Sequence, residues 1–385
     1  MLAVTPLSWP YWVQMLCARL FVSIVNMDRR ALAAPFLALY FTASLLLRSF
    51  DSMWLPIGWM ALGSGFVIAG WSIKPRAAFW GLVLLLVFHA LAIPGSLLWG
   101  NDNWELTMGA LLWMTPNILL FASRATLSVF AWLMPAVFVH AGLILWHGLT
   151  AWTWVDGVLV RQGAHTGLSH NKNLAAGFLA IGIIYLMTTR FRWLSLPLVV
   201  ALLFTGSRWG LLVTVMVLIA MMVTKRVSWR PLMGVVVVVT ATVLLLGWLT
   251  PSPYAIVGYD SFASAAYSAR DNIQGRIAVP HIPSLLPRGV AEHPGLHNVP
   301  LRLAVENGVQ AAMVWVGITV WALTRRRLST EWWLLLTVVM LGLLDYYTFQ
   351  GGHLPYWWML IGLVAGASAR GAVRFEGGVD LDTGR

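Results

Sequence analysis

The sequence predicts an all-α, polytopic membrane protein with about 12 transmembrane helices, and three observations indicate this fold class. Of the 385 residues, 59% are hydrophobic and only 10% are charged, whereas soluble domains contain roughly 25% charged residues. The apolar residues form runs close to the ~20 residues that a helix needs to cross a bilayer. The 23 Trp and 9 Tyr belong to the residue types that collect at membrane interfaces. This composition excludes soluble enzymes, secreted domains and disordered proteins.

The predicted spans are apolar runs that end at charged residues or at Pro/Gly turns. They cover residues 31–47, 53–73, 78–98, 107–123, 126–149, 172–189, 193–205, 208–224, 231–249, 306–324, 331–348 and 354–370. Residues 9–25 fit either an interfacial helix or a thirteenth span. Arg19 interrupts this short run, which favours the interfacial helix.

The basic residues predict the orientation of these spans. One set of termini and alternate loops holds most of the 25 Lys and Arg: Arg19, Arg29, Arg30, Lys74, Arg76, Arg124, Arg190, Arg192, Lys225, Arg226, Arg230, Arg325, Arg326, Arg327, Arg370, Arg374 and Arg385. The other set holds Arg48, Arg161, Lys172, Arg208, Arg270, Arg276, Arg288 and Arg302. Because basic residues concentrate on the cytoplasmic side, we expect both termini to be cytoplasmic.

Four regions follow from this topology. Residues 1–249 form an N-terminal transmembrane region of about nine spans, and 250–305 form a large outer loop between the ninth and tenth spans. Residues 306–374 form a C-terminal region with the last spans, and 375–385 form a cytoplasmic tail.

The charge balance and the motifs limit the possible binding partners of the chain. The net charge of +11 is explained by membrane topology, so we expect membrane lipids and no nucleic acid as partners. The single Cys excludes an intrachain disulfide. The sequence contains no Gly-rich phosphate loop, and no cytoplasmic segment is large enough to hold ATP. We therefore expect neither a nucleotide partner nor a primary pump.

The outer loop 250–305 is basic and rich in Pro and His, which suits an anionic substrate and proton transfer. His297 is a candidate general base because the ordinary pKa of imidazole is ~6.5; the alternative is a surface histidine. Asn298 is expected to cap the tenth span or to bind a substrate hydroxyl. His293 and His297 are four residues apart, but Pro294-Gly295 breaks the helix that a metal site with this spacing needs, so we expect no metal.

Two arginines are candidate phosphate ligands. Arg208 lies in the turn Thr205–Gly210 between two apolar runs, and a guanidinium binds phosphate oxygens in a bidentate way. Snorkelling to lipid headgroups is the alternative for Arg208. Arg276 offers a second phosphate donor or a solvated loop charge, and Arg288 is a further, weaker candidate.

The polar segment Thr166–Ala175 opens the sixth predicted span from the outer side. A helix N-terminus favours an anion, so Asn171 and Lys172 are weaker candidates for substrate binding. Helix capping by Ser169 or Asn171 is the competing interpretation. A further group of histidines lies on apolar helices and is interpreted as packing or interface residues: His89, His140 and His147.

These motifs together resemble the O-antigen ligase and O-antigen polymerase superfamily. The motifs are Thr205-Gly-Ser-Arg208, Gly275-Arg276, and His297-Asn298-x-x-Leu301 followed by Glu306-x-Gly308. Ser169–Ala175 looks like the Asn-rich start of a span in that family. The likeness covers roughly residues 160–310. Two positions depart from the family pattern, with Pro280 where a Trp is often found and Ala311 where a Gly is common.

The resemblance implies a membrane glycosyltransferase of GT-C architecture that needs no cofactor. Such enzymes take a glycan from undecaprenyl pyrophosphate on the periplasmic side of the bacterial inner membrane. Ligases pass it to the lipid A–core oligosaccharide of lipopolysaccharide, with inversion and without a metal. The resemblance implies that Arg208 and Arg276 bind the pyrophosphate and that His297 is the base. These roles agree with the chemistry, since two arginines stabilise a departing pyrophosphate and a weak hydroxyl nucleophile needs a base.

Three alternatives stay open. A polymerase or a protein O-oligosaccharyltransferase of the same superfamily shares these motifs. We favour the ligase because the outer loop is compact and holds the paired arginines with a His-Asn. A transporter or flippase for a lipid-linked anion belongs to another class, and it predicts ionisable residues near the middle of the spans and an internal repeat. Neither feature stands out in the sequence.

Overall fold

The fold is described by a computed structural model over part of the chain. The described residues are 34–35, 37–42, 83, 127–150, 152–155, 158–161, 166–169, 171–249, 298–306, 308–325, 328–344, 356–357 and 359–364. Of the predicted site residues, Arg276, Arg288 and His297 lie outside these ranges.

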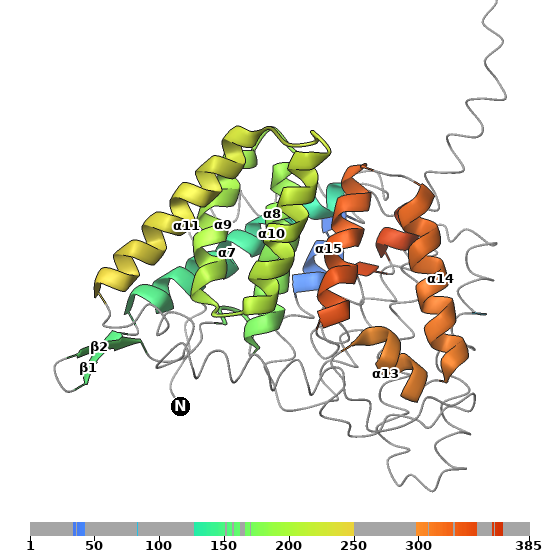
Figure 1. Cartoon of the computed structure of the whole chain (residues 1–385), viewed down its shortest axis with the longest axis horizontal. Helices are drawn as coiled ribbons and strands as arrows, with labels where there is room; N and C mark the ends of the chain where they lie inside the picture. Colours follow the sequence, from blue (N-terminus) through green and yellow to red (C-terminus); the bar gives the residue numbers. More distant parts are fainter. Residues whose placement is uncertain are drawn as a thin grey trace, which may run out of the picture.

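The described chain is helical apart from one short hairpin, which confirms the all-α prediction (Figure 1). The elements in chain order are α7 (Ser128–Thr150), β1 (Trp152–Val155), β2 (Val158–Arg161), α8 (Lys172–Met187), the 3₁₀ turn η2 (Arg192–Leu194), α9 (Ser195–Phe204), α10 (Arg208–Val223), α11 (Trp229–Leu249), α13 (Val299–Glu306), α14 (Val309–Arg325) and α15 (Thr330–Leu344). β1 and β2 pair antiparallel, with Trp152 opposite Arg161.

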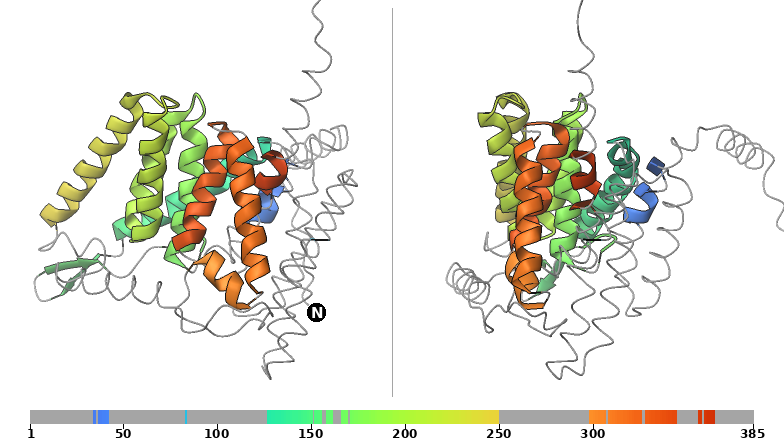
Figure 2. Two further views of the ribbon diagram at one scale, coloured as in Figure 1. Left: turned by 45° about the vertical axis from the view of Figure 1, so that its right-hand side comes forward. Right: turned by 90° about the vertical axis from the view of Figure 1, so that its right-hand side faces the viewer.

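Short connections make α8, α9, α10 and α11 run alternately up and down (Figure 1). As a result α8 and α10 are parallel, and their N-termini lie at the same end. α8 packs against α7, α9, α10 and α15, and nearly all its side chains are buried. This environment explains why α8 is apolar on every side rather than on one stripe. Figure 2 shows α14 and α15 standing beside this group, with α7 on another face and α11 inclined away.

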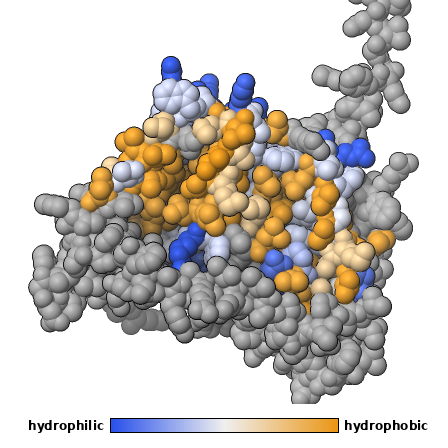
Figure 3. All heavy atoms as spheres, in the orientation of Figure 1, coloured by the Kyte–Doolittle hydropathy of each residue, from blue (hydrophilic) through white to orange (hydrophobic). Residues whose placement is uncertain are grey.

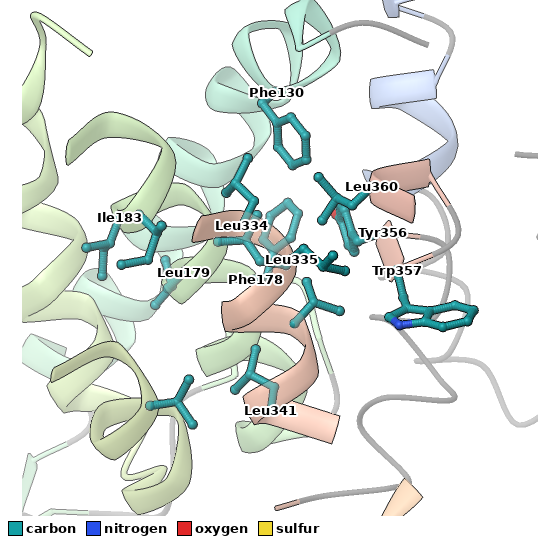
Figure 4. Close-up of a cluster of buried hydrophobic side chains, with 14 of the residues drawn as sticks. Phe130, Phe178, Leu179, Ile183, Leu334, Leu335, Leu341, Tyr356, Trp357 and Leu360 are labelled. Carbon is teal, nitrogen blue, oxygen red and sulfur yellow. The ribbon is translucent and has the colours of Figure 1, made fainter. Parts of the chain in front are cut away.

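The core joins segments that are far apart in the sequence. Figure 4 shows side chains from α7, α8 and α15 gathered with Tyr356, Trp357 and Leu360. The ring of Tyr356 lies 4.4 Å from that of Phe41 and 6.3 Å from that of Phe130, between centroids. Trp357 donates its Nε1 proton to Thr319 Oγ1 at 3.1 Å. Aromatic pairs of this kind stabilise a core beyond simple area burial.

Large apolar side chains also cover the outside of the helices. Trp146 is 65% exposed, Val223 70% and Met313 68%. In the face shown in Figure 3, hydrophobic residues cover the middle of the helices, while hydrophilic residues lie at their ends. Water-soluble monomers rarely expose such continuous apolar surface.

Among the described residues, one helix is both long and apolar enough to cross a membrane, namely Ser128–Thr150. α8 and α10 have 16 residues each, so each rises about 24 Å, less than a hydrocarbon core of ~30 Å. α9 has only 10 residues. The arrangement of about 12 spans therefore stays a prediction.

Two elements differ from the sequence prediction. The hairpin β1–β2 follows α7 where the sequence analysis assigned no structure. The segment before the tenth predicted span is not all loop, because α13 occupies Val299–Glu306. Gly308 has a φ of +88°, a conformation open mainly to glycine, and this residue separates α13 from α14. The helix predicted to begin at residue 306 therefore begins at Val309.

Candidate functional site

The N-terminus of α8 is built by a polar turn and a side-chain cap. Ser169 N donates to Thr166 O at 2.9 Å and closes the turn. Asn171 N then donates to Ser169 Oγ at 3.1 Å. Asn171 Oδ1 accepts from Asn173 N at 2.8 Å and from Leu174 N at 3.3 Å. Asn171 is thus the N-cap of α8, the residue type that this position prefers, and the capping interpretation of its side chain is confirmed.

The N-terminus of α10 is built in the same way from the predicted tight turn. Thr205 Oγ1 accepts from Ser207 N at 3.1 Å and donates to Leu202 O at 2.7 Å. Gly206 supplies a φ of +64°. Ser207 Oγ accepts from Gly210 N at 3.2 Å and caps the helix. The first helical residue is therefore Arg208.

One hydrogen bond joins the two N-termini. Ser207 Oγ donates to Asn173 Oδ1 at 2.7 Å, and it links the cap of α10 to the first turn of α8. The helices approach closely one turn further on, where a Cβ built on Gly210 would collide with the Cβ of Ala176. Glycine at position 210 is therefore required for this contact. The two N-termini form one structural unit.

This unit carries two cations at unusual positions. Lys172 is the first residue of α8 and Arg208 is the first residue of α10, and neither helix has an acid in its first turn. The helix dipole places a partial positive charge at each N-terminus. A cation there is unfavourable by roughly 0.3–1 kcal/mol, and the penalty is relieved by a bound anion. Lys172 is exposed and Arg208 half-buried, so both lie where a ligand can approach.

A third helix N-terminus lies at the same end of the helices (Figure 1). Asn298 Oδ1 accepts from Leu301 N at 3.2 Å, and Asn298 Nδ2 donates to Leu343 O at 3.1 Å. Asn298 therefore caps α13, not the tenth predicted span, and it ties α13 to the end of α15. Arg302, in the same short helix, is only 3% exposed.

The structure thus brings part of the predicted site together. Asn171 and Lys172 lie at the start of α8, Arg208 lies at the start of α10, and Asn298 lies at the start of α13. His297, the predicted general base, directly precedes Asn298 in the sequence but is not among the described residues. Arg276 and Arg288 also lie outside the described residues. Over the residues that are described, no three His, Cys, Asp or Glu side chains converge as a metal site would require.

Sequence reasoning missed three contributors to this site. Asn173 and Ser207 make the bond between the helices, although both stand in segments that were singled out. His140, interpreted as a packing residue, is buried in α7 and bonds to the turn before α8. Ser207 could have been recognised from the sequence, because serine is a capping residue type and stands directly before an apolar run. The contributions of Asn173 and His140 are revealed only by the tertiary structure.

Three comparisons with known proteins found no match to this chain. No family model matches the chain, and neither curated proteins nor solved structures gave a match. The functional argument therefore depends on the motifs and on the site geometry.

Proposed function

We propose that this chain is a membrane glycosyltransferase of the O-antigen ligase type. It transfers a glycan from undecaprenyl pyrophosphate to a hydroxyl of the lipid A–core oligosaccharide. In this proposal the chain is a GT-C bundle of about 12 spans in the bacterial inner membrane. Its site opens to the periplasm, both termini are cytoplasmic, and no cofactor or metal takes part.

The observation that carries the proposal is the hydrogen bond of 2.7 Å from Ser207 Oγ to Asn173 Oδ1. This bond holds together two helix N-termini that each begin with a cation, Lys172 and Arg208. Two positive helix ends and two cations at one place suit a ligand with two adjacent negative groups. A pyrophosphate diester is such a ligand.

The surface supports a membrane location. Apolar side chains are exposed along α7, α10, α11 and α14, for example Val139, Met216, Val237 and Val320. The basic residues of the described helices also divide between the two ends. One end holds Arg190, Arg192, Lys225, Arg226, Arg230 and Arg325, which lie in or beside the α8–α9 and α10–α11 connections and in the last turn of α14. The other end holds Lys172 and Arg208, which begin α8 and α10, and Arg302 of α13 (Figure 1). This division supports the proposed orientation, with the first end cytoplasmic and the second periplasmic.

The proposed reaction is a displacement at the anomeric carbon of the donor glycan. The acceptor oxygen forms a bond to this carbon, and the bond from the carbon to the pyrophosphate oxygen breaks with its electron pair. Arg208 and Arg276 stabilise the charge that develops on the leaving undecaprenyl pyrophosphate. His297 removes the acceptor proton. Attack opposite the leaving group inverts the anomeric configuration.

The remaining candidates take supporting roles. Lys172 supplies a second cation at the joined N-termini. Together, Lys172 and Arg208 neutralise the charge of a pyrophosphate better than one guanidinium alone. Asn171 holds the α8 N-terminus in shape through its two backbone bonds. Asn298 fixes α13 to α15, directly after the base in sequence. Arg288 is a further donor from the outer loop.

The test is transfer by the purified chain in lipid nanodiscs. Undecaprenyl-pyrophosphate-linked glycan and rough lipopolysaccharide are supplied with EDTA, and glycosylated lipopolysaccharide and free undecaprenyl pyrophosphate are measured. We expect both products from the wild type. Arg208→Ala, Arg276→Ala and His297→Ala should each lower the rate by about 100-fold or more. Arg192→Ala is the matched control, because Arg192 lies at the opposite end and bonds to Ser228 at 3.5 Å.

The products also separate the alternatives. Lengthened lipid-linked glycan would indicate a polymerase, and glycan on added protein would indicate a protein transferase. Translocation of intact donor without release of undecaprenyl pyrophosphate would indicate a transporter. Wild-type rates in all three site variants would contradict the proposal.

A further inference from the structure

His140 lies in the middle of α7 and is fully buried. Its Nδ1 accepts the backbone proton of Leu168 at 3.0 Å. Its Nε2 lies 3.4 Å from the carbonyl oxygen of Ala175, in the first turn of α8. The ring meets Phe178 edge-on, with centroids 5.4 Å apart. One imidazole therefore contacts both the turn that precedes α8 and the first turn of α8 itself.

The two bonds define the protonation state of the ring. Nδ1 is an acceptor for Leu168 N, so it carries no proton. Nε2 therefore carries the proton of a neutral imidazole and donates it to Ala175 O. An apolar side chain of the same size would fill the space but would leave the amide of Leu168 without this acceptor.

The turn passes over His140 at a distance that only glycine permits. Gly167 has a φ of +57°. A Cβ at this position would lie 2.8 Å from His140 Nδ1 and 2.9 Å from His140 O. Real Cβ atoms are not found so close to such atoms, so the pairing of Gly167 with His140 is a specific fit.

The first turn of α8 is thus held from two sides. His140 of α7 binds it at Ala175 and through the turn at Leu168. α10 binds it through the Ser207–Asn173 bond and the close contact of Gly210 with Ala176. Lys172 lies within this turn, and Arg208 lies next to Ser207.

We propose that His140 is a positioning residue for the anion site. Its bond to Leu168 fixes the N-terminus of α8, and thereby sets the place of Lys172 relative to Arg208. This inference rests on the proposed function for the identity of the anion, but its structural part does not depend on it.

The first test replaces His140 by asparagine or by glutamine, so that each amide side chain keeps one of the two hydrogen bonds of the imidazole. The Oδ1 of asparagine takes the place of Nδ1, whereas the Nε2 of glutamine takes the place of the histidine Nε2. Inorganic pyrophosphate is titrated into the full chain in nanodiscs, and the dissociation constant is measured by calorimetry. We expect His140→Asn to stay within about threefold of wild type, and His140→Gln and His140→Ala to bind at least about tenfold more weakly.

His147→Asn is the matched control, because this exposed histidine stands on the same helix. It should bind pyrophosphate like the wild type. Unchanged affinity in all three His140 variants would overturn the inference. Equal weakening in all three, with asparagine no better than alanine, would overturn it as well, because it would show that His140 only fills space.

The second test measures position without a ligand. Nitroxide labels are attached at Lys172→Cys and Leu212→Cys in a Cys17→Ser background, and the distance between them is measured by pulsed electron paramagnetic resonance. We expect a narrow distribution for wild type and His140→Asn, and a broadened or shifted one for His140→Gln. Identical distributions would overturn the inference. If the wild type binds no pyrophosphate but the label distances change in His140→Gln as expected, only the proposed function would be overturned.

Discussion

The two ends of the helices carry basic residues in opposite electrostatic settings. At one end, Arg325 lies in the last turn of α14, and Lys225 and Arg226 follow α10. Cations at these C-terminal positions are stabilised by the helix dipole. At the other end, Lys172 and Arg208 begin their helices, where the dipole opposes them.

Two of the basic residues at the first end have aromatic partners close to them in the sequence. Arg190 lies over the ring of Phe191 at 4.8 Å, and Arg325 over Trp321 at 5.7 Å, so these cations bind to side chains next to them. Arg230 also lies in the first turn of a helix, α11, and it is exposed to solvent as Lys172 is, so a cation at a helix start does not by itself mark an anion site. The comparison teaches that Lys172 and Arg208 differ from the other cations in one respect, because their two helix starts are joined by the bond from Ser207 to Asn173.

The largest expected effect concerns the shape of the Arg208 side chain. Arg208→Ala should lower kcat/KM for glycan transfer by about 100-fold or more, and Arg208→Lys by about tenfold, because lysine keeps the charge but loses bidentate binding. Arg192→Lys at the opposite end should have no effect. Equal losses at the two ends would remove the distinction between them.

The next effect concerns the contact between α8 and α10. Gly210→Ala forces a methyl group against Ala176 and should lower the free energy of unfolding by about 1–3 kcal/mol. Gly317→Ala on α14 is the control, because nothing lies within 4 Å of the added Cβ, and better helix propensity should leave stability unchanged or slightly raised. Thermal unfolding in detergent measures both. A harmless Gly210→Ala would show that the helices are not held at this distance.

A smaller effect is expected from Ser207. Ser207→Ala removes the cap bond to Gly210 N and the bond to Asn173 Oδ1, and loss of such a cap costs about 1 kcal/mol. Ser228→Ala is the matched change at the other end, where the bond to Arg192 is long and exposed. The difference in melting temperature between the two variants measures how strongly the N-termini are joined. Equal melting temperatures would indicate that the bond contributes little.

The smallest expected effect is a change in the free energy of unfolding that has opposite signs at the two ends of the helices. In the absence of ligand, Lys172→Glu should raise the free energy of unfolding by about 0.3–1 kcal/mol, while Arg325→Glu should lower it by a similar amount, as the helix dipole requires. Chemical denaturation at low ionic strength measures both changes. Destabilisation by Lys172→Glu would indicate that Lys172 has a structural partner that the variant loses.

Several helices could be predicted closely from the sequence. The runs 126–149, 208–224 and 231–249 agree with Ser128–Thr150, Arg208–Val223 and Trp229–Leu249 to within a few residues. Long apolar runs with caps or charges at their ends define such helices locally. The run 193–205 also agrees with the structure, where the 3₁₀ turn η2 leads directly into α9 and the two together cover Arg192–Phe204.

The site could be predicted only in part. Asn171, Lys172 and Arg208 stand beside apolar runs, so their places at helix starts follow from local capping signals. The bond that joins Ser207 to Asn173 spans 34 residues and depends on how α8 packs against α10. The role of His140 depends on a glycine 27 residues later, Gly167, whose fit over the ring exists only in the folded chain. α13 was missed because Pro300 and Arg302 interrupt a run that is short and only partly apolar.

The most direct test of the central claim is the binding of inorganic pyrophosphate to the joined N-termini of α8 and α10. Pyrophosphate is titrated into wild type, Arg208→Ala, Lys172→Ala and Arg192→Ala in nanodiscs, and the shift in melting temperature is recorded. We expect stabilisation of wild type and Arg192→Ala, about 2.7 kcal/mol at 100 times the dissociation constant, and little or none in the two site variants. Equal stabilisation of all four proteins, or of none, would contradict the claim.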